Sequence, residues 1–347
     1  MLRAERGTMS TYRAVMLTKK GGPETLQEVE LPVKEPGPGE LRIRVRACGV
    51  GYTDITMRRS YYPYAPKMPF VPGYEVIGEV DAIGPGVSGF QPGQRVAGLM
   101  VHGGYAELLV RSAADFIPVP DGLDDAEAVS LILNYVTAYQ MIHRAAQLRP
   151  GQTALVDGAN GGLGTALLEL LRLHGCPAIG AASPKHHDAI RALGATPIES
   201  RSTSLDAGTR AVRPEGVDAS FDGLGDVYVG QCTRATKRGG IVVAYGFTAT
   251  IKNGNASLMG VLRTYTSLYA GARLAGRRST FYGITEIYRK DPRPFREDLP
   301  KLFELLRQGS IRPRIAARLG LLEGRKAQEM LEAGGIDGKI VLVRGKT

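Results

Sequence analysis

The feature that most constrains the fold is a β-prone run at residues 153–157 that leads directly into a glycine-rich turn and an apolar helical pattern. From there to about residue 246, strand patterns alternate with helix patterns. Such alternation produces βαβ units, because neighbouring parallel strands need a crossover connection. The sequence therefore predicts an α/β protein whose main sheet is parallel and doubly wound.

The first 120 residues follow a different pattern, with short strand-like segments separated by Gly/Pro turns. In LRIRVRA, residues 41–47, apolar side chains alternate with arginines, which predicts a half-buried strand with its basic face in water. The tail returns to mixed helix and strand patterns that we expect to pack back onto this first domain. We therefore expect a discontinuous β-rich domain at residues 10–130 and 290–347, and a cofactor domain at residues 131–289.

The formal net charge of +10 favours anionic ligands. The arginines are dispersed, and no helix-turn-helix, zinc-finger or RNA-binding pattern is present, so nucleic acid is not an expected partner. No apolar run approaches the ~18 residues that span a bilayer, and the N-terminus has no apolar signal core. We therefore expect a cytoplasmic protein without stable membrane insertion.

The glycine-rich turn reads DGANGGLG, residues 157–164, and resembles a dinucleotide-binding fingerprint in which Ala159 replaces the first glycine. A glycine at the second position lets the backbone approach a pyrophosphate, and the third allows close packing of helix on strand. The helix N-terminus offers free N–H groups to the phosphates. The predicted pyrophosphate-binding residues are Asn160, Gly161, Gly162, Leu163 and Gly164.

The choice between NAD and NADP depends on the end of the next strand, about 20 residues further on. NAD sites place a carboxylate there, whereas this chain has Ser183, Lys185 and His186. A hydroxyl and cations suit a 2′-phosphate, so the sequence predicts NADPH, with Arg201 as a second phosphate contact. The alternative is that these residues simply begin a solvated helix.

Several motifs together carry a family resemblance: PFVPGYEVIGEVDAIGPGVSGFQPGQRV, GGYAELLV, LILNYVTAY, DGANGGLG, FDGLG, VVAYG and GKIVLV. With these motifs the chain resembles the medium-chain dehydrogenase/reductase superfamily, and within it the zinc-independent quinone oxidoreductase branch, which includes the VAT-1-like group. The resemblance implies a GroES-like catalytic domain built from both ends of the chain. It also implies an inserted Rossmann NADP-binding domain and a homodimer assembled through the Rossmann sheets.

The resemblance also bears on zinc. Gly51 stands where the zinc alcohol dehydrogenases have a Cys, and Tyr74 stands where they have a His. The three cysteines, Cys48, Cys176 and Cys232, are too far apart for a clustered Cys site. We therefore expect no metal, and a hydride acceptor that stabilises its own negative charge, namely a quinone or an α,β-unsaturated carbonyl.

The resemblance suggests further site residues in both domains. The cofactor candidates are Asn134, Thr137, Asp222, Gly223, Gly246, Phe247 and Lys339. Tyr52 and Tyr62 are candidates for the substrate pocket or the proton donor, although either ring could simply pack. The quinone reductase branch usually has Asn where Gly51 stands, so this chain departs from the usual substrate geometry.

Three other functions remain open. An enoyl-thioester reductase could use the basic stretches Arg273–Arg278 and Arg289–Arg296 to hold a phosphate of its substrate. A tailoring enoyl reductase of secondary metabolism would show the same motifs. A non-enzymatic, NADPH-binding structural or membrane-associated protein is also compatible with them, and the loss of Asn at Gly51 mildly favours it.

Overall fold

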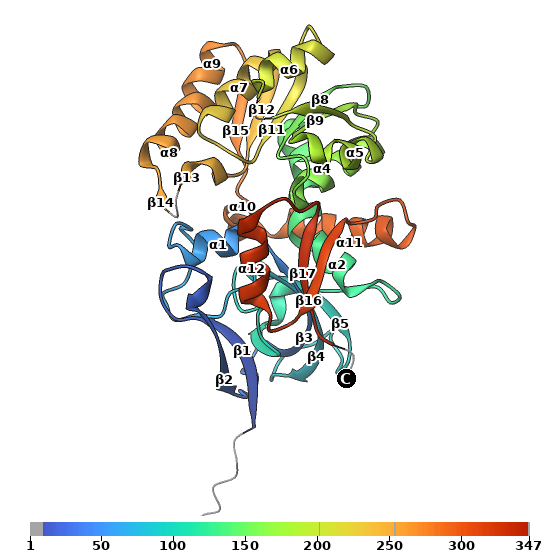
Figure 1. The fold of residues 1–347 in the computed structure, drawn as a ribbon. Coiled ribbons are helices and arrows are strands. Elements are labelled where there is room, and N and C mark those ends of the chain that lie inside the picture. The colour runs from blue at the N-terminus through green and yellow to red at the C-terminus, as the bar shows by residue number, and fades with distance from the viewer. Residues whose placement is uncertain (1–9, 201, 253–254, 346–347) are drawn as a thin grey trace, which may run out of the picture. The chain divides into compact units, whose positions relative to one another are not determined.

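The computed structural model describes residues 10–345 except 201 and 253–254, and it divides into two compact units (Figure 1). The first unit runs up to Val129 and takes in Arg318–Ala333 and the chain from Ile340. The second unit comprises Ser130–Ala317 and Gly334–Lys339. Each unit is described by itself below.

The first unit is built on antiparallel strands. β1 (Thr11–Leu17) and β2 (Leu26–Pro32) form a two-stranded sheet. The larger sheet has the order β16-β17-β3-β4-β5-β7, and β6 also pairs with β3. Its strands are β3 (Glu40–Val50), β4 (Glu75–Ile83), β5 (Arg95–Leu99), β6 (Leu108–Ser112), β7 (Phe116–Pro118), β16 (Ile315–Gly320) and β17 (Lys339–Val343). The helical segments are η1 (Pro23–Thr25), α1 (Tyr52–Arg58), η2 (Ala113–Asp115), α2 (Asp125–Ser130) and α12 (Gly324–Ala333).

Strand β3 confirms the predicted alternation and refines it. Leu41, Ile43 and Val45 are fully buried. The arginines between them lie on the other face, where Arg42 pairs with Asp81 at 2.6 Å. The basic face of this strand is thus largely neutralised by carboxylates of the same unit.

The second unit contains a six-stranded, wholly parallel sheet in the order β10-β9-β8-β11-β12-β15. This is the doubly wound order predicted from the alternation of strands and helices. Its strands are β8 (Ala154–Asp157), β9 (Ala178–Ala182), β10 (Thr196–Glu199), β11 (Val217–Asp222), β12 (Thr236–Ala244) and β15 (Arg278–Phe281), and a separate pair consists of β13 (Ile251–Lys252) and β14 (Asn255–Ala256). The order reverses between β8 and β11, which makes their carboxyl ends the expected ligand-binding position.

The helical segments of this unit join and cover the strands. They are η3 (Leu131–Tyr135), α3 (Val136–Gln140), η4 (Met141–Ala146), α4 (Gly162–Leu173), η5 (Pro184–His186), α5 (His187–Ala192), α6 (Leu205–Val212), α7 (Val227–Ala235), η6 (Thr248–Thr250), α8 (Leu258–Tyr265), η7 (Thr266–Gly271), α9 (Ala272–Leu274), α10 (Ile284–Lys290) and α11 (Arg293–Arg307). All four residues of β8 are buried, as expected for a central parallel strand covered on both faces. Among the described residues, no helix is both long enough and apolar enough to cross a membrane.

The chain from residue 290 to 314, before β16, lies in the second unit, whereas the sequence pattern assigned it to the discontinuous first domain. The reason is a buried polar contact of α11. Asp298 is fully buried and accepts hydrogen bonds from Gln140 Nε2 at 3.0 Å and Arg144 Nε at 2.8 Å. These partners lie on α3 and η4, so α11 belongs with the helices of the cofactor domain.

Candidate functional site

The glycine-rich turn connects β8 directly to α4. Gly158 adopts a positive φ of 66°, and α4 begins at Gly162. A Cβ atom at Gly164 would lie 2.3 Å from the carbonyl oxygen of Gly158, so only glycine allows this approach of helix to strand. The first N–H groups of α4 lack partners within the helix and are available to an anion.

A cavity of about 380 Å³ lies beside this turn, at the carboxyl ends of the parallel strands. It is lined by Asp157, Gly158, Asn160, Ala181, Ala182, Ser183, Lys185, His186, Ser200, Leu224, Tyr228, Thr248, Ala249 and Gly335. The lining residues follow β8, β9, β10, β11 and β12 in turn. The cavity is thus at the switch point where a doubly wound sheet binds a dinucleotide.

Four of the predicted cofactor residues line this cavity: Asn160, Ser183, Lys185 and His186. Gly161, Gly162, Leu163 and Gly164 form the adjoining turn and the first turn of α4. Arg201 lies outside the described residues.

Asn134 and Lys339 meet on the other side of the turn. Lys339 Nζ lies 3.5 Å from Asn134 Oδ1, and a Cβ on Gly162 would be 2.5 Å from Asn134 Nδ2. Thr137 is buried one helical turn after Asn134 and is absent from the cavity lining.

The remaining predicted residues hold the turns that follow β11 and β12. Asp222 accepts hydrogen bonds from the backbone N–H groups of Leu224 and Gly225. A Cβ on Gly246 would lie 2.3 Å from the carbonyl oxygen of Gly223, so these two turns pack backbone to backbone. Phe247 stacks on Phe281 with ring centroids 4.9 Å apart. In this structure these residues shape the edge of the cavity rather than line it.

The loop 334–339 crosses the turn, a contact that sequence reasoning did not anticipate except for Lys339. Asn160 Nδ2 donates to the carbonyl oxygen of Ile336 at 3.0 Å, and Gly338 N donates to the carbonyl oxygen of Asn160 at 2.9 Å. Asp337 Oδ1 lies 2.7 Å from His186 Nδ1. The available signal was the motif GGIDG, whose glycines suit a tight loop.

Two buried carboxyl groups, Asp157 in the lining of the cavity and the predicted Asp222, are paired, and the sequence did not predict this pairing. Asp157 and Asp222 are both fully buried at the ends of the neighbouring strands β8 and β11. Burial and the nearby Asp222 raise the pKa of Asp157 well above its usual range. Burial raises the pKa of Asp222 too, although two backbone N–H donors oppose the shift. The pair therefore keeps a proton to higher pH than two isolated carboxyl groups would. A singly charged pair repels a phosphate-bearing ligand less than two carboxylates would.

The predicted tyrosines lie in the first unit. Tyr62 Oη is 2.8 Å from Tyr74 Oη, and Tyr74 is almost fully buried. Burial raises the pKa of Tyr74 well above its usual value, and the neighbouring Tyr62 adds to this shift. Tyr52 is the first residue of α1, and burial raises the pKa of its hydroxyl as well. The raised pKa values keep the hydroxyls of Tyr52 and Tyr74 protonated at neutral pH, which makes them unsuited to act as bases.

Gly51 and Asp54 organise the start of α1. Asp54 is fully buried and accepts hydrogen bonds from Gly51 N at 2.9 Å and from Gly73 N at 3.1 Å. Asp54 thus ties the segment before α1 to the segment that carries Tyr74. Within the part of the chain that the structure describes, no three His, Cys, Asp or Glu side chains are grouped as metal ligands. Neither Gly51 nor Tyr74, whose hydroxyl is hydrogen-bonded to that of Tyr62, has a side chain of the types that usually bind zinc.

The basic stretch Arg273–Arg278 does not border the cavity. Arg278 begins β15 and thus lies at the amino edge of the sheet, whereas the cavity lies at the carboxyl edge. The Arg277 guanidinium donates to the carbonyl oxygens of Thr236 and Ala275. These arginines therefore do not form a basic entrance to the cofactor cavity.

Comparisons with known proteins agree with this architecture. Residues 37–121 match the alcohol dehydrogenase GroES-like domain family, and residues 193–342 match the zinc-binding dehydrogenase family. The synaptic vesicle membrane protein VAT-1 homolog of Mus musculus is 31% identical over 340 residues, covering 96% of this chain and 84% of that protein. A quinone oxidoreductase-like protein 2 homolog of Nematostella vectensis is 29% identical over 339 residues, covering 96% and 89%. A mycobacterial protein solved in complex with NADPH has a TM-score of 0.84 at 26% identity, covering 96% of this chain and 100% of that one.

Proposed function

Because this chain belongs to the medium-chain dehydrogenase/reductase superfamily, with VAT-1 and quinone oxidoreductase-like proteins among its relatives, we propose that it is an NADPH-dependent reductase. It transfers hydride, without zinc, to a quinone or to an α,β-unsaturated carbonyl. One observation carries the proposal. The cavity at the strand-order reversal brings the glycine-rich turn together with Ser183, Lys185 and His186.

Different residues of the second unit bind different parts of NADPH. The N-terminus of α4 and the Asn160 side of the turn hold the pyrophosphate, because free N–H groups favour a negative charge there. Ser183 and Lys185 hold the 2′-phosphate through a hydroxyl and a cation. Because the Asp157–Asp222 pair holds a proton, it carries at most one negative charge at this end of the sheet, which lowers its repulsion of the cofactor phosphates.

The first unit supplies donors to the acceptor. NADPH, when bound, supplies the hydride. A quinone or enone delocalises the resulting charge onto its oxygen, so a hydrogen-bond donor suffices where a metal would otherwise polarise the carbonyl. Tyr62, held by Tyr74 at 2.8 Å, and Tyr52 are the proposed donors. Gly51, directly before Tyr52 in the chain, lacks the amide side chain of the Asn typical of this branch.

The test is turnover by the purified full chain. NADPH oxidation should be measured with quinones, enones and enoyl thioesters, with NADH as the cofactor control and with and without a zinc chelator. We expect chelator-insensitive turnover of a quinone or enone with a clear preference for NADPH. Tight NADPH binding without turnover of any acceptor would contradict the proposal and favour a non-enzymatic role.

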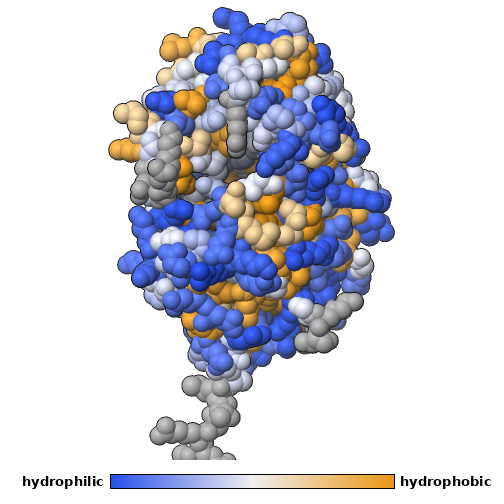
Figure 2. Space-filling view, viewed as in Figure 1, coloured by the Kyte–Doolittle hydropathy of each residue, from blue (hydrophilic) through white to orange (hydrophobic). Residues whose placement is uncertain are grey.

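We also propose that the chain is a homodimer assembled through the second unit. Among the described residues, β15 pairs only with β12, so one side of this strand is open to further pairing. The preceding helical segments carry exposed apolar side chains, namely Leu258, Met259, Leu262, Tyr265, Tyr269 and Leu274. In Figure 2 apolar surface is visible at the upper left, over α8 and α9. Apolar surface of this extent supports burial against a second copy.

A further inference from the structure

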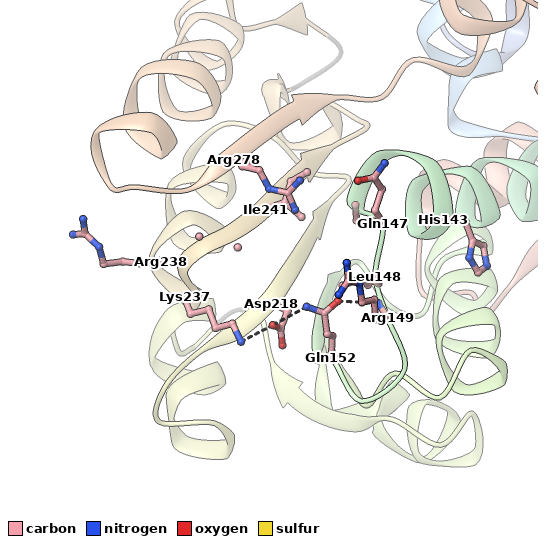
Figure 3. A pocket seen from close by; sticks show the side chains of 13 residues that line it. His143, Gln147, Leu148, Arg149, Gln152, Asp218, Lys237, Arg238, Ile241 and Arg278 are labelled. Carbon is pink, nitrogen blue, oxygen red and sulfur yellow. Dashed lines mark hydrogen bonds and ion pairs between the residues drawn. The ribbon is translucent and has the colours of Figure 1, made fainter.

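A second cavity, of about 790 Å³, lies in the second unit at the opposite edge of the parallel sheet (Figure 3). Its lining comes from η4, from the loop between η4 and β8, and from the amino-terminal parts of β11, β12 and β15. The lining residues are His143, Ala146, Gln147, Leu148, Arg149, Gln152, Asp218, Lys237, Arg238, Gly239, Gly240, Ile241 and Arg278. None of them lines the cofactor cavity, so the two cavities are separate features of one unit.

The second cavity is strongly basic. Four of its side chains are cations, namely Arg149, Lys237, Arg238 and Arg278, and Asp218 is its single carboxylate. Lys237 Nζ pairs with Asp218 Oδ1 at 2.5 Å. Asp218 also accepts from the backbone N–H of Thr153, a contact that helps to lower its pKa. The carboxylate is therefore already satisfied and cannot balance the arginines.

The three arginines of this cavity have no counter-charge. Within the described part of the chain, no carboxylate pairs with the guanidinium groups of Arg149, Arg238 and Arg278. Figure 3 shows Lys237, Asp218 and Gln152 joined in one chain of contacts, with Arg238 pointing away from them. His143 adds no charge at neutral pH, because burial and nearby positive groups lower its pKa to about 4.

Like charges also accumulate beyond the lining. Arg277, next to Arg278, has a lowered pKa, chiefly because of burial and also because of the positive charges of Arg210 and Arg238. Mutual repulsion of this kind destabilises the folded state, and an anion placed among the charges relieves it. A concave shape strengthens the effect, because low-dielectric walls focus the field.

Helix termini do not account for these charges. Cations stabilise a helix C-terminus only within its last turn. Here η4, α7 and α9 end at Ala146, Ala235 and Leu274, and the arginines follow three or four residues later. Two glycines, Gly239 and Gly240, form part of the lining, and a Cβ at Gly239 would meet no atom within 4 Å.

We propose that this cavity binds a small soluble anion that carries two or more phosphate groups, separately from the nicotinamide cofactor. Guanidinium groups match phosphate oxygens in pairs, which favours phosphates over a single halide or carboxylate. Several cations around one cavity favour a multivalent anion over inorganic phosphate. A cavity of this size fits a small molecule, whereas the flat surface of a macromolecule would not enter it.

The test uses tripolyphosphate as the probe and the full chain saturated with NADP⁺, so that the cofactor cavity is occupied. Binding is measured by calorimetry and by thermal unfolding at constant ionic strength, with chloride and inorganic phosphate for comparison. The double variant Arg149→Gln/Arg278→Gln should bind tripolyphosphate at least about tenfold more weakly, because two of the unpaired charges are removed. Arg312→Gln is the matched control, since Arg312 is exposed and lies outside both cavities.

We expect the wild type and Arg312→Gln to bind alike, and both to prefer tripolyphosphate over inorganic phosphate. Equal binding by the double variant, or a response that follows ionic strength alone, would overturn the proposal. If the double variant fails to fold, each single variant should still weaken binding about threefold. Should NADP⁺ itself fail to bind, the comparison of variants at this cavity remains valid, so the two proposals fail separately.

Discussion

Two alanine substitutions in the glycine-rich turn should separate folding from cofactor binding. At Gly164 a new Cβ would lie 2.3 Å from the Gly158 carbonyl oxygen and 2.7 Å from Ala159 Cα, both backbone atoms that cannot rotate away. At Gly161 the nearest atom would be the Gly158 carbonyl oxygen at 3.5 Å, an ordinary contact, and φ is −72°. Gly164→Ala should therefore strain the fold, whereas Gly161→Ala should not.

The magnitudes follow from these distances. Overpacking costs about 1–3 kcal/mol, and backbone clashes place Gly164→Ala near the upper end. For a domain of this size about 3 kcal/mol lowers the melting temperature by about 6–12 °C. Gly161→Ala should change stability by less than about 0.5 kcal/mol. Its methyl group would stand where a pyrophosphate approaches the turn, so NADPH binding should weaken about tenfold or more, or about 1.4 kcal/mol.

Thermal unfolding without cofactor measures the first effect, and titration of NADPH fluorescence measures the second. The reasoning would be refuted if Gly161→Ala bound NADPH like the wild type. It would equally be refuted if Gly164→Ala melted at the wild-type temperature, because the close packing of α4 on β8 would then tolerate a side chain.

Three further results are expected. Ser183→Asp with Lys185→Ala should weaken NADPH far more than NADH in binding titrations, because a carboxylate would replace the proposed phosphate contacts; equal weakening would exclude the 2′-phosphate assignment. Asp157→Asn should gain stability relative to the wild type as the pH rises from about 5 to 8, because a carboxyl with a raised pKa stabilises the fold only while protonated. Calorimetry across that range tests it, with the exposed Asp188→Asn as control, and parallel curves for Asp157→Asn and the wild type would argue against the buried pair. Leu262→Glu should convert the proposed dimer to a monomer in analytical ultracentrifugation, and an unchanged mass would place the interface elsewhere.

The parts of the fold that the sequence predicts correctly are those encoded locally. β8 is a short apolar run that ends in glycines, and both its burial and the turn after it follow from about a dozen neighbouring residues. Similar local patterns predict the parallel sheet and the alternating strand β3. The presence of the cavity next to the turn follows from the same strand–turn–helix unit.

The missed features depend on contacts between distant segments. Asp157 and Asp222 meet because β8 and β11 become neighbours at the strand-order reversal. Asp337 reaches His186 only because the loop 334–339 returns to the second unit. The pattern of α11 shows which of its faces is apolar, but not which core covers that face. The hydrogen bonds of the buried Asp298 hold α11 in the second unit, and their donors lie more than 150 residues earlier in the chain.

The net charge of +10 is distributed differently in the structure from what the sequence pattern suggests. Read locally, Arg42, Arg44 and Arg46 form a basic stripe in water, yet Asp81, Glu79 and Asp125 pair with all three. Ion pairs of this kind cancel most of the field beyond a few ångströms. A cavity at the amino edge of the parallel sheet instead collects arginines without carboxylate partners. No sequence motif marks it, because its arginines come from the loop before β8 and from the strands β12 and β15. The unpaired arginines of this cavity are therefore a feature of the folded second unit that the net charge of the chain does not reveal.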